Sequence, residues 1–306
     1  MIAVGGPEIL KLAASGLALD LCPTLGGSIV ALRWRHPAGN WIDLLRPSSA
    51  AALASGDIEG VGCFPLTPFS NRLRDGRFEF DGRQIVLPPN TAGPHVEHGH
   101  GWQRPWQVVS ATRDRAILRL THAADAWPFD YAAEQRFHLG SDGLDMEMTA
   151  RNDGDRAMPF GFGLHPYFPR TPACRLTATV SGFWETDAEV MPTRHIPPPA
   201  ALDPTRGLAV GKHALDNAFT GWRGRAVIDW PEHATRLTLS ATAAFRVLVV
   251  YIPPDEDYFC AEPVSNCTDA FNLAHRRDDT GLLAVEPGQS VSARVAFRPE
   301  VIGWRG

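Results

Sequence analysis

Residues 157–168, Ala-Met-Pro-Phe-Gly-Phe-Gly-Leu-His-Pro-Tyr-Phe, decide the fold. With the period of two typical of a β-strand, four large apolar side chains share one face: Met158, Phe160, Phe162 and Leu164. The opposite face carries Pro159, Gly161 and Gly163 and then His165. Glycines within a strand often mark a close approach of a ligand to the backbone, and Pro166 restricts His165 to extended backbone. The pattern predicts a strand with one core face and a rigidly mounted histidine; the alternative is a histidine satisfied by a loop carbonyl.

Short strand-like segments separated by turn residues continue on both sides of this stretch. We expect strands over 16–22, 27–35, 72–87 (with tight turns), 106–122 (two strands), 131–139, 144–152, 225–230, 236–240, 245–252, 257–262 and 290–298. The dipeptides Asp75-Gly76 and Asp81-Gly82 are strong turn signals. Residues 48–55 predict a short helix, and the Pro-rich stretch from Pro192 to Pro204 predicts a loop. Many short strands of this kind are typical of a sandwich or barrel, so we predict one large antiparallel all-β domain over residues 1–306.

Composition excludes several classes of protein. A chain of 306 residues with 44% hydrophobic residues can build a large core, and all-β folds of this length occur as one domain. The formal net charge of −5, without a basic stripe, argues against a nucleic-acid partner. No stretch approaches a membrane span, and residues 1–15 lack a charged segment followed by an apolar run. Five cysteines without CxxC spacing indicate a reduced, cytoplasmic protein.

A second residue able to transfer protons is Glu262, in Tyr258-Phe-Cys-Ala-Glu-Pro263. Alternation places Tyr258, Cys260 and Glu262 on one face. Like His165, Glu262 precedes a proline at the end of a predicted strand, so its backbone is held extended. The shared placement predicts a preorganised acid/base pair. Taken alone, Glu262 also fits a surface carboxylate, because Glu is rarely buried.

A third group is the run His95-Val-Glu-His98-Gly-His100-Gly-Trp-Gln-Arg104-Pro-Trp106. The spacing of His98 and His100 resembles the H-x-H of cupin metal sites. Such a site needs a carboxylate a few residues downstream, where this chain has Gln103, Arg104 and Pro105. We therefore expect no metal here, and an irregular loop in which one histidine donates hydrogen bonds to a polar ligand.

Further polar residues suit a ligand rich in hydroxyl groups. The loop Phe64-Pro-Leu-Thr-Pro-Phe-Ser-Asn-Arg72 ends in an amide and a guanidinium, Asn71 and Arg72, which fix hydroxyl and ring oxygens well. Asp216 either accepts hydrogen bonds from vicinal hydroxyls or begins a turn. Nine tryptophans are many for this length, and one or two of them can supply an apolar platform for a sugar face.

These motifs together resemble a known family. Asn71-Arg72, His98-Gly99, His165-Pro166-Tyr167-Phe168, the Asp216 segment and Glu262-Pro263 have the order and rough spacing found in aldose 1-epimerases, the galactose mutarotases. The resemblance runs from about Gly26 to Arg298. It implies a large β-sandwich, the galactose mutarotase-like supersandwich, acting on a monosaccharide without cofactor or metal, as a monomer or weak homodimer. It implies His165 as general acid, Glu262 as general base, and a sugar held by Asn71, Arg72, His98 and Asp216.

Departures from the best-studied mutarotases leave the sugar open. The loop reads His98-Gly-His100-Gly-Trp102 where those enzymes have a Gly-Gly form, and Val264-Ser265-Asn266 follows the Glu-Pro. One alternative is a hexose-6-phosphate 1-epimerase of the same fold, for which Arg104 is the one credible phosphate ligand. Another is a non-catalytic sugar-binding β-sandwich, and a third is the cupin-like metal enzyme. For the epimerase, we expect Glu262 to ionise near ~4.3 and a site carboxylate to raise the pKa of His165 above ~6.5.

Overall fold

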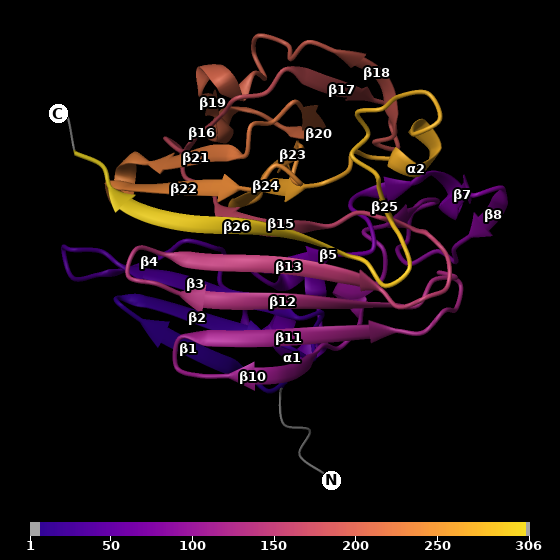
Figure 1. Cartoon of the computed structure of the whole chain (residues 1–306). Helices are drawn as coiled ribbons and strands as arrows, with labels where there is room; N and C mark the ends of the chain where they lie inside the picture. The colour runs from indigo at the N-terminus through magenta and orange to yellow at the C-terminus, as the bar shows by residue number, and fades with distance from the viewer. Residues whose placement is uncertain (1–6, 304–306) are drawn as a thin grey trace.

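A computed structural model describes residues 7–303 of the chain, which form two large antiparallel sheets packed face to face. In Figure 1 the magenta-to-yellow strands of one sheet lie in front of the indigo strands of the other. The prediction of an all-β, antiparallel β-sandwich is confirmed. Among residues 7–303, no helix has the length and apolar character needed to span a membrane. The prediction for residues 1–15 lies partly outside the described part, which begins at residue 7.

The larger sheet has eleven strands. In spatial order they are β1 (Leu10–Ala14), β2 (Leu17–Cys22), β3 (Ser28–Arg35), β5 (Cys63–Leu66), β15 (Gly163–Pro169), β24 (Tyr258–Val264), β23 (Val247–Ile252), β20 (Leu215–Thr220), β17 (Gly182–Thr186) and β18 (Pro192–Ile196), with β4 (Trp41–Asp43) paired to β3. Strand β15 therefore lies in the middle of the sheet, between β5 and β24.

The second sheet has nine strands, in the order β10 (Gln107–Ala111), β11 (Arg115–His122), β12 (Tyr131–Leu139), β13 (Leu144–Asn152), β26 (Ser290–Val301), β22 (Thr235–Ala241), β21 (Arg225–Trp230), β16 (Arg175–Ala178) and β19 (Leu208–Ala209). Three two-stranded ladders join β14 (Met158–Phe160) to β25 (Leu283–Val285), β6 (Arg72–Leu73) to β9 (Val96–Glu97), and β7 (Arg77–Phe80) to β8 (Arg83–Val86). The helices are short: α1 (Ala50–Ser55), α2 (Ala270–Leu273) and the 3-10 turns η1 (Ile58–Gly60), η2 (Arg74–Gly76), η3 (Gly101–Gln103), η4 (Pro204–Arg206), η5 (Val210–Lys212) and η6 (Pro231–His233).

The two faces of the eleven-stranded sheet pack into different clusters of side chains. Side chains on its inner face join those of the nine-stranded sheet in one large core, which includes the apolar set of the deciding stretch: Met158, Phe160, Phe162 and Leu164. Each of these four is at most 1% exposed. On the other face Tyr167 belongs to a second, smaller cluster with Phe64 and Trp102. Alternation along β15 thus separates the sandwich core from the face that holds His165.

The predicted secondary structure holds over most of the chain. The expected hairpins appear as β2–β3, β10–β11 and β12–β13, and α1 lies within the predicted helix. The predicted loop between Pro192 and Pro204 was wrong in its first part, because Pro192–Ile196 forms the edge strand β18 against β17. An edge strand tolerates Pro192, since no further strand needs its missing N–H. All five cysteines are buried and unpaired, as their spacing predicted.

The deciding stretch differs from its prediction in two respects. It is divided into β14 and β15, and His165 and Glu262 lie inside β15 and β24, not at their ends. The glycines on the His165 face of this stretch, Gly161 and Gly163, also do not leave space for a ligand. A Cβ atom on Gly161 would lie 2.1 Å from Asn266 Oδ1, and one on Gly163 would lie 2.6 Å from Val264 Cγ1. These glycines make room for neighbouring protein.

We expect Gly161→Ala to lower the free energy of unfolding by about 1–3 kcal/mol, because overpacking costs that much where the neighbour is held. Asn266 is held: its Oδ1 accepts from the Ser70 N–H at 3.1 Å, and its Nδ2 donates to the Ser70 carbonyl at 3.0 Å. Urea unfolding measures the change. The matched control is Gly93→Ala, whose Cβ would meet only Thr91 Oγ1 at 3.8 Å. Equal stability of the two variants would mean that Asn266 moves aside without a measurable cost in free energy.

Candidate active site

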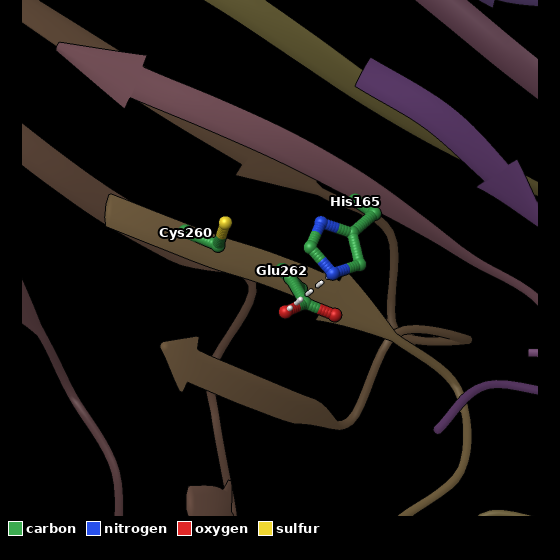
Figure 2. A group of neighbouring side chains, drawn as sticks. All are labelled: His165, Cys260 and Glu262. Atoms are coloured by element: carbon green, nitrogen blue, oxygen red, sulfur yellow. Dashed lines mark ion pairs between the residues drawn. The ribbon is translucent and has the colours of Figure 1, made fainter. Parts of the chain in front are cut away.

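His165 and Glu262 meet across the centre of the eleven-stranded sheet. The register pairs Gly163 with Val264 and Tyr167 with Cys260, which places His165 opposite Glu262. His165 Nε2 lies 3.5 Å from Glu262 Oε1, and Figure 2 shows this contact as a dashed line. The two residues are only 8% and 2% exposed. The structure thus brings together the two groups that the sequence predicted as an acid/base pair.

The imidazole of His165 packs against two aromatic rings. Its centroid lies 4.6 Å from that of Phe64 and 4.8 Å from that of Tyr167, with interplanar angles of 30° and 23°. The Arg46 guanidinium in turn lies between Tyr167 and Tyr258, at 4.1 and 4.3 Å from the ring centroids. A ring packed against two aromatic neighbours loses little conformational freedom when a ligand arrives, so the geometry of the pair is preorganised.

A network of charges lies beside the pair. Arg72 Nε is 3.0 Å from Glu97 Oε1, and Arg72 Nη1 is 3.5 Å from Asp216 Oδ2. Arg72 and Glu97 are cross-strand neighbours in the β6–β9 ladder, whereas Asp216 comes from β20. The turn that sequence alone allowed at Asp216 is thus a strand.

Asn71 and His98 are fixed to each other by two backbone contacts. The Asn71 N–H donates to His98 Nδ1 at 3.0 Å, and the His98 N–H donates to the Asn71 carbonyl at 2.9 Å. Burial lowers the pKa of His98 well below its usual range, and the charges of His165 and Arg72 act in the same direction. The ring is therefore neutral, and because its Nδ1 accepts a hydrogen bond, its Nε2 carries the proton. His98 thus offers one N–H donor.

These residues surround a cavity of about 200 Å³. All six site residues predicted from sequence line it: Asn71, Arg72, His98, His165, Asp216 and Glu262. Sequence reasoning assigned no site role to seven further lining residues: Glu59, Phe64, Glu97, Trp102, Tyr167, Tyr251 and Tyr258. Five of the seven, Phe64, Glu97, Trp102, Tyr167 and Tyr258, stood within the quoted motifs. Glu97 stood between two candidate histidines, and the register of β6 with β9 was the missing information.

Two residues from the histidine-rich run lie away from this cavity. His100 Nε2 forms a hydrogen bond with the Tyr131 hydroxyl at 2.9 Å, and its ring packs on His122. Because His98 and His100 face different surroundings, they do not form the H-x-H metal site considered from sequence. Arg104, the candidate phosphate ligand, pairs with Asp125 at 2.8 Å, and both side chains are partly exposed.

Burial sets the protonation of the central pair. It raises the pKa of the Glu262 carboxyl well above its usual range; Asp216 and Glu97 add to the rise, and Arg72 opposes it. Burial also lowers the pKa of His165 to about 3, with Arg46 and Arg72 acting in the same direction. This corrects the prediction that a site carboxylate raises the pKa of His165, because desolvation outweighs that attraction. Both shifts favour the uncharged form of their group, so we assign the resting pair one proton, on Glu262.

One group within residues 7–303 has the composition of a metal site. His165, Cys260 and Glu262 each place one ligand atom within 4.8 Å of the others (Figure 2). The metal ligand from cysteine is the thiolate, and burial raises the pKa of the Cys260 thiol well above its usual range. We therefore assign no metal to this group.

A larger hollow of about 840 Å³ lies on the nine-stranded sheet, along β10–β13, β22 and β26. Its charged side chains are partly or fully exposed and form surface ion pairs, as in the contact of Arg294 Nε with Glu147 Oε1 at 3.1 Å. A catalytic site needs groups whose protonation the protein controls, which the smaller cavity provides.

Comparisons with known proteins find relatives over nearly the whole chain. The aldose 1-epimerase family model matches residues 9–298. The uncharacterized protein YphB of Escherichia coli K12 is 31% identical over 301 residues, covering 95% of this chain and 99% of its own length. A crystal structure of a candidate aldose 1-epimerase from Escherichia coli K12 shares 32% identity with a TM-score of 0.87, covering 96% of this chain and 99% of its own. A galactose mutarotase-like protein from Clostridium acetobutylicum (22% identity, TM-score 0.85, 96% and 95% covered) shares the fold.

We expect the His165 ring to remain neutral throughout the neutral pH range, because burial holds its pKa near 3. Histidine-selective ¹⁵N NMR, assigned with His165→Gln, should show the shifts of a neutral ring from about pH 8 down to about pH 5. His138, whose side chain is 39% exposed, is the internal comparison, since solvent reaches its ring. A protonation step of His165 near ~6.5, or imidazolium shifts at neutral pH, would contradict the assignment.

Proposed function

Because the chain belongs to the aldose 1-epimerase family, we propose that it interconverts the α and β anomers of a free aldose in the cavity above His165 and Glu262. The family implies an isomerase. The observation that carries the proposal is the buried contact of these two residues at 3.5 Å, in a cavity lined by hydrogen-bonding groups.

The separation of the pair suits the reaction. Anomer exchange removes a proton from the anomeric hydroxyl and adds one to the ring oxygen, and both oxygens are bonded to the same carbon. Acid and base must therefore converge on one point. We assign Glu262 as the base and His165 as the acid. The ring opens to the aldehyde, the C1–C2 bond rotates, and closure returns both protons with the two roles exchanged. Each positioned proton transfer contributes about 10²–10⁴-fold.

The protonation of the pair is compatible with these roles. Moving the single proton from Glu262 to His165 gives the carboxylate and imidazolium that the reaction needs, without changing the total charge. The raised pKa of Glu262 delays loss of this proton as pH rises, and the low pKa of His165, about 3, delays gain of a second proton as pH falls. The reactive charge state is thus accessible across neutral pH.

The remaining polar residues hold the sugar in this proposal. Arg72 and the Nε2–H of His98 supply donors, and Asn71 adds an amide close to both. Asp216 accepts from hydroxyl groups. Their support is that all four line the same cavity as the pair.

The alternatives fit the site less well. A hexose-6-phosphate 1-epimerase needs a cationic phosphate site, yet Arg104 pairs with Asp125 outside the cavity. A sugar-binding protein without catalysis has no need for His165 and Glu262, and burying two titratable groups together is costly. The free, uncharged aldose remains the substrate that the cavity supports best.

We expect His165→Ala and Glu262→Gln each to lower kcat by about 10²–10⁴-fold, because each removes one positioned proton transfer. Polarimetry on freshly dissolved α-D-glucose and α-D-galactose measures the rate, and circular dichroism checks the fold. The matched controls are His138→Ala, in the larger hollow, and Glu79→Gln, exposed on β7. A sugar-binding protein would show no difference between variants and controls.

Chelators should leave the rate unchanged, because His98 and His100 face different surroundings and the acid/base mechanism uses no metal. The measurement is polarimetry before and after treatment with EDTA or 1,10-phenanthroline, with elemental analysis of the untreated protein. One zinc, iron or manganese per chain, together with loss of activity on its removal, would contradict the proposed mechanism.

A further inference from the structure

Arg72 is the one Lys or Arg side chain among the residues of 7–303 that line the cavity, and it is already paired. We propose that Glu97 is a specificity-determining residue: by neutralising Arg72, it excludes aldoses that carry a phosphate or carboxylate and admits uncharged and amino-bearing aldoses. The inference rests on the proposed function, since it names the substrate class of the same cavity.

The backbone fixes Glu97 beside Arg72 before any sugar binds. The two residues are directly opposite in the β6–β9 ladder, where side chains on one face lie about 5 Å apart at Cβ. Asn90 holds the strand from its other side: its Oδ1 accepts from the Glu97 N–H at 2.9 Å, and its Nδ2 donates to the Glu97 carbonyl at 2.6 Å. Asn90 Nδ2 also donates to the Gly99 carbonyl at 2.8 Å. Hydrogen bonds to the backbone thus hold Glu97 in place in its ion pair with Arg72.

The charged groups around the cavity also disfavour an anionic substrate. Four carboxyl groups line it, against one guanidinium: Glu59, Glu97, Asp216 and Glu262. Two of them already repel each other: burial raises the pKa of Asp216, and the charge of Glu97 adds to the rise while Arg72 opposes it. An anionic substituent would add a further negative charge to this set. An ammonium group would relieve the repulsion.

Arg72 alone would favour the opposite class of substrate. A free guanidinium binds a carboxylate or phosphate through two parallel hydrogen bonds. Here its Nε already faces Glu97 at 3.0 Å and its Nη1 faces Asp216 at 3.5 Å, so an anionic substituent would have to displace a carboxylate that the backbone holds in place. Whether the cavity favours or excludes anionic sugars therefore depends on Glu97.

Anomer exchange NMR at equilibrium tests the proposal with four sugars: D-glucose, D-glucosamine, D-glucuronate and D-glucose 6-phosphate. For the wild type, kcat/KM for the two anions should be at least about tenfold below that for glucose, and glucosamine should match or exceed glucose. In Glu97→Gln the ratio of anion to glucose should rise by about tenfold or more. Glu59→Gln is the matched control, because it removes the same formal charge from the cavity lining and Glu59 lies in η1, away from the β6–β9 ladder. In Glu59→Gln the ratio of anion to glucose should change by less than about threefold.

Three results would overturn the proposal: a wild type that prefers an anionic sugar, an unchanged ratio in a folded Glu97→Gln, or an equal shift in Glu59→Gln. The last would assign selectivity to the total charge of the cavity. If the wild type accelerates exchange of none of the four sugars, the proposed function fails. Saturation-transfer NMR then measures binding of the same sugars, and Glu97→Gln must gain binding of the two anions for the charge selectivity to stand.

Discussion

The contact between His165 and Glu262 constrains the rest of the structure, because two titratable groups have been removed from water together. An ion pair at this depth would cost several kcal/mol per ion in desolvation. Burial shifts the pKa of Glu262 up and the pKa of His165 down, and both shifts favour the uncharged form of their group. Such a pair needs rigid walls that exclude water, and the aromatic rings of Phe64 and Tyr167, which pack against the imidazole, supply part of them.

The position of the pair follows from the use of both faces of one sheet. Pro166 and Pro263 provide no N–H to the ladder between β15 and β24, so hydrogen bonding is weakened beside the pair. Packing compensates on the opposite face, where Leu164 and Phe168 are fully buried in the sandwich core. The same strand that anchors the core therefore carries the candidate acid, and a change in core packing alters the geometry of the site directly.

Sequence predicted what depends on local pattern and missed what depends on distant partners. Strict alternation gave β12 and β13 their observed bounds, whereas the edge strand at Pro192 required knowledge of β17. His98 and His100 look equivalent in sequence, yet the left-handed backbone of His98 and Gly99, with φ of 58° and 67°, sends their rings to different surroundings. The pKa of His165 was predicted with the wrong sign, because a motif names neighbouring charges but not the degree of desolvation.

The proposed reaction suits a site of this kind because it conserves charge. An aldose is uncharged as the ring, as the open aldehyde and as the product. The pair holds one proton at the start and one at the end. Nothing charged enters or leaves, so the buried groups need no solvent to compensate a change in charge. A phosphate or carboxylate on the sugar would break this balance beside Glu97 and Asp216. The protonation assigned to the pair, the compensated guanidinium of Arg72 and the proposed uncharged substrate are each consistent with the same low-dielectric cavity.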